Sequence, residues 1–251
     1  MKSLNVLTIG NGFSSDCHTF LPYIAEAEET QLYIANLYIP GGTLEQHYRN
    51  WIDENQVYTL EVYLPGEKEL IKPDEIALHE VVEDEDFDII VLQQSSALAG
   101  IKSSYKPYLG ELAEYCRMMH PNTTVMLHQV PAYSENCKNE AFAKYYNGDN
   151  ENMHSAIVAA CYEAADEAEI GIIIPNAVAW KTARESKIGD RLTINGYHGN
   201  EIGNFLSGCV FWQSFTDIKA TDIKFNLPEY DKAVSELIKV CAYIAKNTPD
   251  D

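Results

Sequence analysis

The sequence predicts an α/β fold, a doubly wound three-layer α/β/α sandwich around a mostly parallel, five-stranded central sheet. Short apolar runs of strand length alternate with segments of helical spacing, and no internal repeat breaks this alternation. The run from Asp88 to Leu92 is apolar and largely β-branched after its first residue, as a central parallel strand is. A chain of 251 residues can bury a substantial core, so we expect one domain over residues 1–251.

Each predicted strand and helix follows from the spacing of its apolar residues. Apolar runs predict strands at residues 4–9, 31–39, 88–92, 123–127 and 171–174, and an alternating segment at 57–64 suits an exposed or edge strand. Helical spacing predicts helices at residues 15–29, 106–119, 151–168, 176–186 and 229–246, with further helices beginning near 43 and 203. The long polar segment 134–152 is expected to cover the cleft.

Charge and composition argue against several classes of partner. The chain has 38 Asp and Glu against 18 Lys and Arg, a net charge of -20, so the clustered cations that nucleic-acid phosphates need are not expected. No run approaches the ~20 apolar residues of a membrane helix, and Met1-Lys2-Ser3 leads into the first strand without an apolar signal region. We therefore expect a cytoplasmic protein that binds no membrane, and we leave its oligomeric state open.

The end of the first predicted strand has the pattern of a catalytic turn. The apolar run from Leu4 to Ile9 breaks at Gly10 into small and polar residues, where a helix begins. Such a junction holds a side chain at the carboxyl edge of a parallel sheet, beside the exposed amides of a helix N-terminus. This geometry suits a nucleophile with an oxyanion hole.

The residues of this turn resemble a known family. Ile9-Gly10-Asn11-Gly12-Phe13-Ser14 is similar to the first block of the SGNH (GDSL-type) hydrolases, in a bacterial branch where the block reads Gly-Asn-Ser-Phe-Ser. The segment from Asp190 to Gly203 resembles the Asp-x-x-His block of that family. The resemblance spans roughly Leu4 to Trp212 and implies the SGNH, flavodoxin-like sandwich and esterase activity on acyl esters, often as an acetylesterase acting on carbohydrates.

The resemblance also implies a role for individual residues. It places the nucleophile at Gly12, the catalytic base at His198 and the acid at Asn195. Oxyanion donors would be the backbone of Gly12, the backbone of either Gly41 or Gly42, and the side chain of Gln94. The residues expected to contact the substrate, a small ester or an acylated carbohydrate, are Asn11, Gln93, His47, His128, Tyr133 and Tyr197.

The sequence departs from the family at the two positions that carry the chemistry. Gly12 has no hydroxyl and Asn195 has no carboxylate, and losing members of a catalytic triad removes most of its rate enhancement. Three interpretations remain open: an inactivated form of a working esterase, a natural pseudoenzyme that binds a sugar or an acyl ester, or rescue by Ser14 or Ser15. The last is disfavoured because two residues further along a helix turn the side chain by about 200°.

A metal-dependent hydrolase is a hypothesis of a different class. It would use His47, His128 and His198, with Asp16 as a carboxylate ligand, but their spacing matches no metal motif such as His-Glu-x-x-His. Gly10-Asn11-Gly12 also lacks the third glycine of a dinucleotide-binding fingerprint. We therefore expect no metal and no other cofactor.

Overall fold

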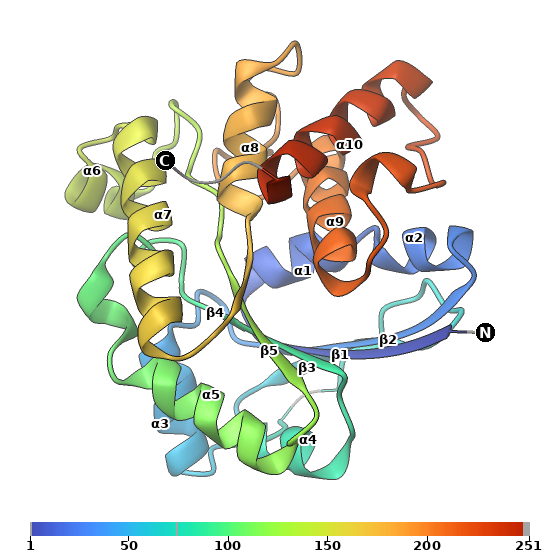
Figure 1. The fold of residues 1–251 in the computed structure, drawn as a ribbon. Helices are drawn as coiled ribbons and strands as arrows, with labels where there is room; N and C mark the ends of the chain where they lie inside the picture. Colours follow the sequence, from blue (N-terminus) through green and yellow to red (C-terminus); the bar gives the residue numbers. More distant parts are fainter. Residues whose placement is uncertain (1, 74, 248–251) are drawn as a thin grey trace.

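The computed structural model describes residues 2–73 and 75–247, and a six-stranded sheet lies at its centre (Figure 1). The strands are β1 (Lys2–Gly10), β2 (Thr30–Tyr38), β3 (Thr59–Tyr63), β4 (Ile89–Gln93), β5 (Thr124–His128) and β6 (Ile172–Ile174), in the order β3-β2-β1-β4-β5-β6. All neighbouring pairs are parallel except β2 with β3, which is antiparallel. The predicted fold class is confirmed, and the sixth strand is the edge strand expected near 57–64.

The position of β1 in the middle of the sheet explains its sequence. Val6 pairs with Ile34 of β2 on one side and with Ile89 of β4 on the other. Because helices cover both faces of such a sheet, side chains pointing to either face are buried, and the second half of β1 is apolar at nearly every position. The turn that follows β1 therefore leaves the sheet near its centre.

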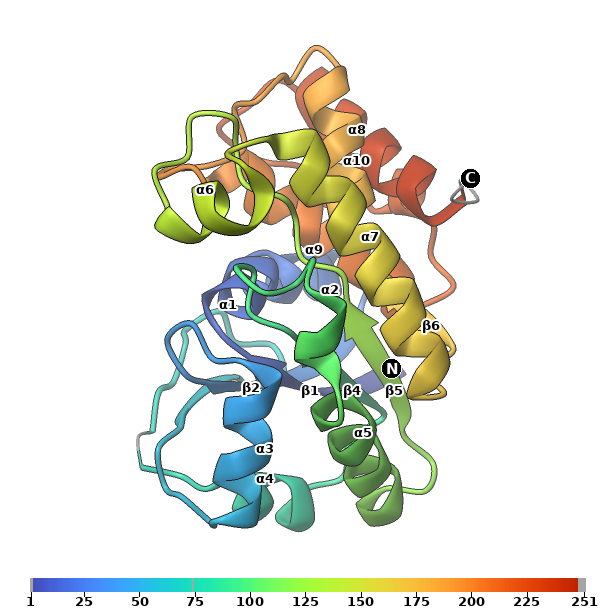
Figure 2. The ribbon, with the colours of Figure 1, turned by 90° about the vertical axis from the view of Figure 1, so that its left-hand side faces the viewer.

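Helices form a layer on each face of the sheet (Figures 1 and 2). One layer contains α1 (Gly12–His18), α2 (Leu21–Ala27), α8 (Asn176–Glu185), α9 (Glu201–Phe215) and α10 (Lys232–Asn247). The opposite layer contains α3 (Leu44–Ile52), α4 (Leu78–Asp84) and α5 (Tyr108–Met119). Between the layers, α7 (Asn150–Glu167) lies beside β6 and contacts both α8 and the short 3-10 helix η1 (Lys102–Tyr105). The short elements α6 (Glu140–Tyr146) and η2 (Ala220–Asp222) complete the structure.

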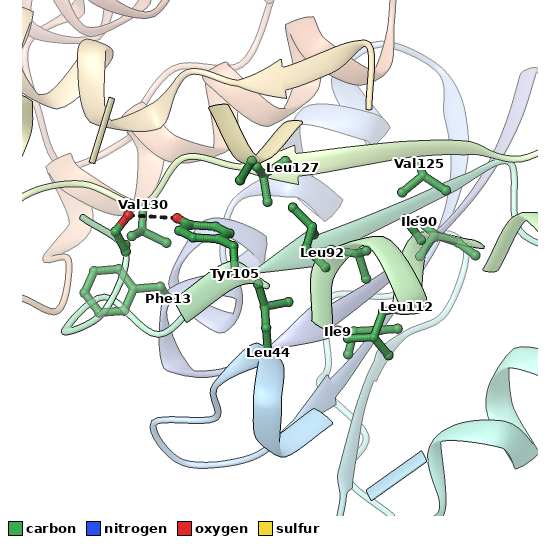
Figure 3. Close-up of a cluster of buried hydrophobic side chains, with 14 of the residues drawn as sticks. Ile9, Phe13, Leu44, Ile90, Leu92, Tyr105, Leu112, Val125, Leu127 and Val130 are labelled. Carbon is green, nitrogen blue, oxygen red and sulfur yellow. Dashed lines mark hydrogen bonds between the residues drawn. The ribbon is translucent and has the colours of Figure 1, made fainter. Parts of the chain in front are cut away.

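Two hydrophobic cores join these layers to the sheet. Figure 3 shows part of the core on the α3 and α5 side, where Ile9, Leu92 and Leu127 of three adjacent strands lie near Leu44 of α3. Phe13 of α1 belongs to this same core although α1 lies on the opposite face. The first turn of α1 is therefore anchored at the edge of the sheet, one residue after Gly12.

Two predicted segments differ from the structure. The helix expected over 15–29 is two helices, because α1 begins earlier, with Asn11 as its N-cap, and Pro22 in the first turn of α2 favours a new helix start. The polar segment 134–152 is not a single loop, since it contains α6 and the beginning of α7. Asn139 and Asp149 cap these helices, so residues that favour loops by composition here begin helices. Among the described helices, none has the length and apolarity needed to cross a membrane.

Candidate active site

A pocket of about 330 Å³ opens where β1, β2, β4 and β5 end. Open α/β sheets bind their ligands at this carboxyl edge, because the loops that leave neighbouring strands diverge there. The residues lining the pocket are Asn11, Gly12, Phe13, Tyr38, Pro40, Gly41, Ser95, Ser96, Ala97, Tyr133, Asn139, Tyr197 and His198.

Gly12 and His198 face each other at this pocket. A Cβ atom on Gly12 would lie 2.5 Å from Cε1 of His198 and 3.3 Å from Nε2. The first distance is far below van der Waals contact, so the imidazole occupies space that any side chain at position 12 would need. Two residues that are distant in sequence, and that the family resemblance assigned to one site, therefore lie in direct contact.

The carboxylate next to this imidazole is that of Asp16. Its Oδ2 lies 2.9 Å from Nδ1 of His198 and also accepts a hydrogen bond from the backbone N–H of Gly199 at 3.0 Å. Asp16 follows Gly12 by four residues, so both lie on the same face of α1. A proton on Nδ1, donated to Asp16, leaves the lone pair of the neutral ring on Nε2.

Asn195, which the resemblance placed at the position of the acid, makes different contacts. Its Oδ1 accepts hydrogen bonds from the backbone N–H groups of Tyr197 and His198, at 3.2 and 2.8 Å. The side chain thus closes the turn that carries His198, while the hydrogen bond to the ring comes from Asp16. The sequence contained one signal for Asp16, its spacing of four residues from Gly12, but the partner of a histidine depends on how the ring is turned.

Gln94, the expected side-chain donor of the oxyanion hole, is engaged elsewhere. Its Oε1 accepts from the backbone N–H groups of Leu44 and Ser95, at 3.2 and 2.8 Å. Its Nε2 donates to the carbonyl oxygen and the hydroxyl of Ser104, at 2.8 and 3.0 Å. Because both amide protons are used and Gln94 does not line the pocket, this side chain ties α3 to the segment after β4 instead of facing a ligand.

The two glycines after β2 have different surroundings. Gly42 donates its N–H to the carbonyl of Ile39 at 3.0 Å, and a Cβ on it would lie 2.9 Å from Nε2 of His47. Gly41 lines the pocket and has a φ of +64°, a conformation that glycine adopts without strain. Of the two candidates that the sequence left open, Gly41 is the one placed beside the pocket.

His47 lies behind this turn and away from the pocket lining. It is fully buried, and its Nδ1 is 3.0 Å from the hydroxyl of Tyr58. Burial lowers the pKa of His47 from 6.5 to about 4, so the ring is neutral near pH 7. The imidazole packs against the turn at Gly42 and does not line the pocket, so it is not placed to contact a substrate as expected.

A buried row of side chains runs from the core to the pocket. His128 Nδ1 lies 2.6 Å from Oε1 of Gln93, Gln93 Nε2 donates to Oδ1 of Asn11 at 2.7 Å, and Asn11 Nδ2 donates to the carbonyl of Gly42 at 3.0 Å. Burial, with a smaller contribution from His18, lowers the pKa of His128 from 6.5 to about 3. Of the three side chains in this row, Asn11 reaches the pocket, and Gln93 and His128 hold it in place from within the protein.

Both tyrosines expected to contact the substrate do line the pocket. The hydroxyl of Tyr133 lies 2.8 Å from Oγ of Ser96, and its ring centroid is 5.5 Å from that of Tyr197. Tyr197 and Phe13 flank the imidazole of His198, with ring centroids at 4.8 and 5.5 Å. Ser95 and Ser96 also line the pocket but were not among the predicted site residues, although they come shortly after Gln93, the last residue of β4.

Ser14 and Ser15 are turned away from the pocket. The hydroxyl of Ser14 donates to the carbonyl of Asn11 and contacts Oδ1 of Asn36, at 2.7 and 2.9 Å. The hydroxyl of Ser15 donates to the carboxylate of Glu61. Neither serine lines the pocket, so the structure gives no support to rescue by a nearby serine.

The three histidines of the metal hypothesis have separate partners. His47 contacts Tyr58, His128 contacts Gln93, and His198 contacts Asp16. Within residues 2–73 and 75–247, no group of three or more His, Cys, Asp or Glu side chains is arranged to hold a metal ion. The metal hypothesis therefore has no geometric support.

Comparison with known proteins identifies the family and the fold. A family model described as "Domain of unknown function (DUF4886)" matches residues 5–245. The crystal structure of a DUF4886 family protein from Bacteroides uniformis is 32% identical in sequence, with a TM-score of 0.95 over 100% of this chain and 97% of that one. No curated protein matches the chain.

More distant structures share the architecture. A proposed SGNH hydrolase from Slackia heliotrinireducens is 16% identical, with a TM-score of 0.56 over 86% of this chain and 100% of that one. The lipase/acylhydrolase from Enterococcus faecalis is 14% identical, with a TM-score of 0.53 over 84% of this chain and 94% of that one. The chain therefore belongs to the DUF4886 family and has the fold found in these SGNH-type structures.

Proposed function

We propose that the pocket is an ester-binding site of the SGNH hydrolase kind, in which covalent catalysis is suppressed because residue 12 has no hydroxyl. The observation that carries this proposal is the contact between position 12 and His198, with Cβ of a substituted residue 3.3 Å from Nε2. In a serine hydrolase the base lies within hydrogen-bond reach of the nucleophile, at a turn where backbone N–H groups stabilise the oxyanion. Gly12 and Gly41 line this pocket, and we assign such backbone groups to them.

The lining favours a small, uncharged substrate. None of the lining residues is Lys, Arg, Asp or Glu, so a carboxylate or phosphate group on the substrate would find no compensating charge. Tyr38, Tyr133 and Tyr197 offer aromatic faces, and Ser95 and Asn139 offer polar groups, a combination that suits an acylated sugar ring. The distant SGNH-type neighbours, one of them a lipase/acylhydrolase, support ester chemistry in this pocket. Because the pocket draws on residues from 11 to 198, we also propose that the chain works as one domain.

Restoring the missing groups tests this function. We expect Gly12→Ser to raise hydrolysis of small aryl acetates, and Gly12→Ser with Asn195→Asp, the restored variant, to raise it further, by about 10³-fold over the present chain. The added Cβ would lie 2.5 Å from Cε1 of His198, so the ring has to move away from position 12. A carboxylate at position 195, in the turn that carries His198, then offers Nδ1 a second acceptor beside Asp16. Initial rates at fixed pH are the measurement.

A matched glycine replacement controls for the added hydroxyl. Gly110 lies in α5, and a Cβ on it would meet no atom within 4 Å, so Gly110→Ser adds the same group outside the site. We expect this variant to hydrolyse esters at the rate of the present chain. A restored variant that is folded, as judged by circular dichroism, yet inert on a broad panel of esters would contradict the proposed function.

A further inference from the structure

We propose that Asp16 and His198 form a general-base pair that activates a water molecule for direct attack on the bound ester. This inference rests on the proposed function of the pocket and goes beyond it, because it assigns the present chain a slow hydrolytic route that needs no nucleophilic side chain. The supporting observations are the hydrogen bond between Asp16 and Nδ1 of His198 and the position of Nε2 beside Gly12 in the pocket lining.

The carboxylate of Asp16 is held in place from two directions. Its Oδ2 is bonded to Nδ1 of His198 at 2.9 Å and to the backbone N–H of Gly199 at 3.0 Å. The hydrogen bond from Gly199 holds Oδ2 in position whether the ring of His198 is neutral or protonated, because a backbone N–H keeps its proton at any pH near neutrality. A carboxylate on Nδ1 fixes the tautomer with its lone pair on Nε2 and stabilises the imidazolium that forms when Nε2 takes up a proton.

The ring nitrogen that Asp16 does not contact, Nε2, lies 3.3 Å from the Cβ position of Gly12, a residue of the pocket lining. His198 lines the pocket, and no hydrogen bond to its Nε2 is found in the part of the chain that the structure describes. Phe13 and Tyr197 flank the ring, with centroids at 5.5 and 4.8 Å, which limits its rotation. A water molecule at hydrogen-bond distance from Nε2, about 2.8 Å, therefore lies beside a substrate bound in the pocket.

Gly12 permits this arrangement. Because it has no Cβ, the ring lies over the backbone of α1 and reaches Asp16, which sits one turn further along the helix. A side chain at position 12 would force the ring outward, since Cε1 is 2.5 Å from the Cβ position. Glycine at position 12 therefore provides no nucleophile, but it leaves the space in which the imidazole can contact Asp16 and activate a water molecule.

The reaction consumes one ester and one water. As the water oxygen bonds to the acyl carbon, Nε2 of His198 accepts one of the water protons, and Asp16 stabilises the resulting imidazolium. The bond between the acyl carbon and the alcohol oxygen then breaks, and Nε2 returns the proton to that oxygen. The products are one carboxylic acid and one alcohol, and no acyl group is attached to the protein at any stage.

Hydrolysis of an aryl acetate by the purified chain of residues 1–251 tests the proposal. Proton transfer by a positioned base contributes about 10²–10⁴-fold, so we expect His198→Gln and Asp16→Asn each to lower the rate above buffer by at least about 10²-fold. Asp86→Asn is the matched control, because Asp86 also lies near a histidine, 3.8 Å from His120, and is fully exposed in the loop between α4 and β4, outside the pocket lining. This control should keep the rate of the present chain.

Asp16 is a positioning residue, so its variant needs a readout other than the rate. The chemical shifts of the imidazole nitrogens report which nitrogen carries the proton, and we expect a hydrogen-bonded Nδ1 proton on His198 that is lost in Asp16→Asn and kept in Asp86→Asn. Peptide mass spectrometry after incubation with excess ester should show no acyl adduct on the residues that line the pocket. His198→Asn provides a second variant if His198→Gln does not fold.

Three outcomes would overturn the water route: a rate of the present chain equal to that of His198→Gln, an acyl adduct on a residue that lines the pocket, or a nitrogen signal unaffected by Asp16→Asn. The proposed function can fail separately. If the restored variant cleaves esters while the rate of the present chain is independent of His198, the water route alone is wrong. If the restored variant is inert as well, the ester site itself is wrong.

Discussion

His198 and His128 each have a side-chain oxygen next to Nδ1, and the difference between these two oxygens separates a candidate base from a structural residue. His198 is bonded to the carboxylate of Asp16 at 2.9 Å and lines the pocket. His128 is bonded to the amide of Gln93 at 2.6 Å and is fully buried. An amide does not neutralise a positive ring, and burial lowers the pKa of His128 to about 3, so His128 is neutral near pH 7, whereas a positive ring at His198 would face a carboxylate.

The two histidines also differ in how they support the pocket rim. Through Gln93 and Asn11, His128 holds the Gly42 turn without touching a ligand. His198 instead belongs to the lining itself and contacts the backbone at Gly12. A charge on His128 would cost stability, whereas a charge on His198 has a carboxylate to balance it.

The largest expected difference between the two histidines is in catalysis. In the Gly12→Ser/Asn195→Asp background, we expect His198→Gln to lower kcat by about 10³-fold or more, because the base is lost. His128→Gln in the same background should stay within about tenfold, because a buried positioning residue touches no reacting atom. Ester hydrolysis by the three proteins is the measurement, and equal losses in the two variants would break the distinction.

The burial of His128 should make the stability of the protein sensitive to acid. The unfolded chain protonates His128 near its ordinary pKa of 6.5, while the folded chain does so only near pH 3, so the unfolded state binds more protons between these values. This contribution to the free energy of unfolding is complete above about pH 6.5 and is lost as the pH falls, by about 1.4 kcal/mol per pH unit. Urea unfolding between about pH 5 and pH 7 should show that His128→Gln removes this share of the slope, and an unchanged slope would contradict the buried, neutral ring.

The smallest expected effect concerns Gln94. Since its amide ties Leu44 and Ser104 together, we expect Gln94→Ala to cost about 1–3 kcal/mol of stability while hydrolysis by the restored variant stays within about tenfold. Removing a true oxyanion donor would lower kcat by about 10²–10³-fold. Gln46→Ala, at an exposed position of α3, is the control for both stability and rate. A loss of activity as large as that for an oxyanion donor would restore the role expected from the sequence.

Much of the fold follows from the sequence for a clear reason. Buried parallel strands such as 88–92 are continuous apolar runs, and the turn at Gly10 marks the carboxyl edge where the pocket lies. The contact between Gly12 and His198 could be anticipated because two motifs far apart in the chain resembled blocks of one family. The edge strand near 57–64 was also visible in its alternating pattern.

The hydrogen-bond partners of the site residues depend on side-chain rotations and on contacts between elements, which the spacing of residues in the sequence does not determine. Asp16 and Asn195 are both close to His198 in the fold, and which of them holds the ring depends on a side-chain rotation. Gln94 differs from its expected role because Ser104 and Leu44 approach it from separate elements. The break between α1 and α2 likewise depends on local capping and on Pro22.

A thiol at position 12 can report whether this position and His198 share one reactive site. In a Gly12→Cys variant, the adjacent imidazole should increase the thiolate fraction, so we expect chloroacetamide to label position 12 about tenfold faster than it does in the same variant carrying His198→Gln. Labelling of a Gly110→Cys variant, followed by peptide mass spectrometry, should be independent of His198. Equal labelling of position 12 with and without His198 would show that the two residues do not share a reactive site.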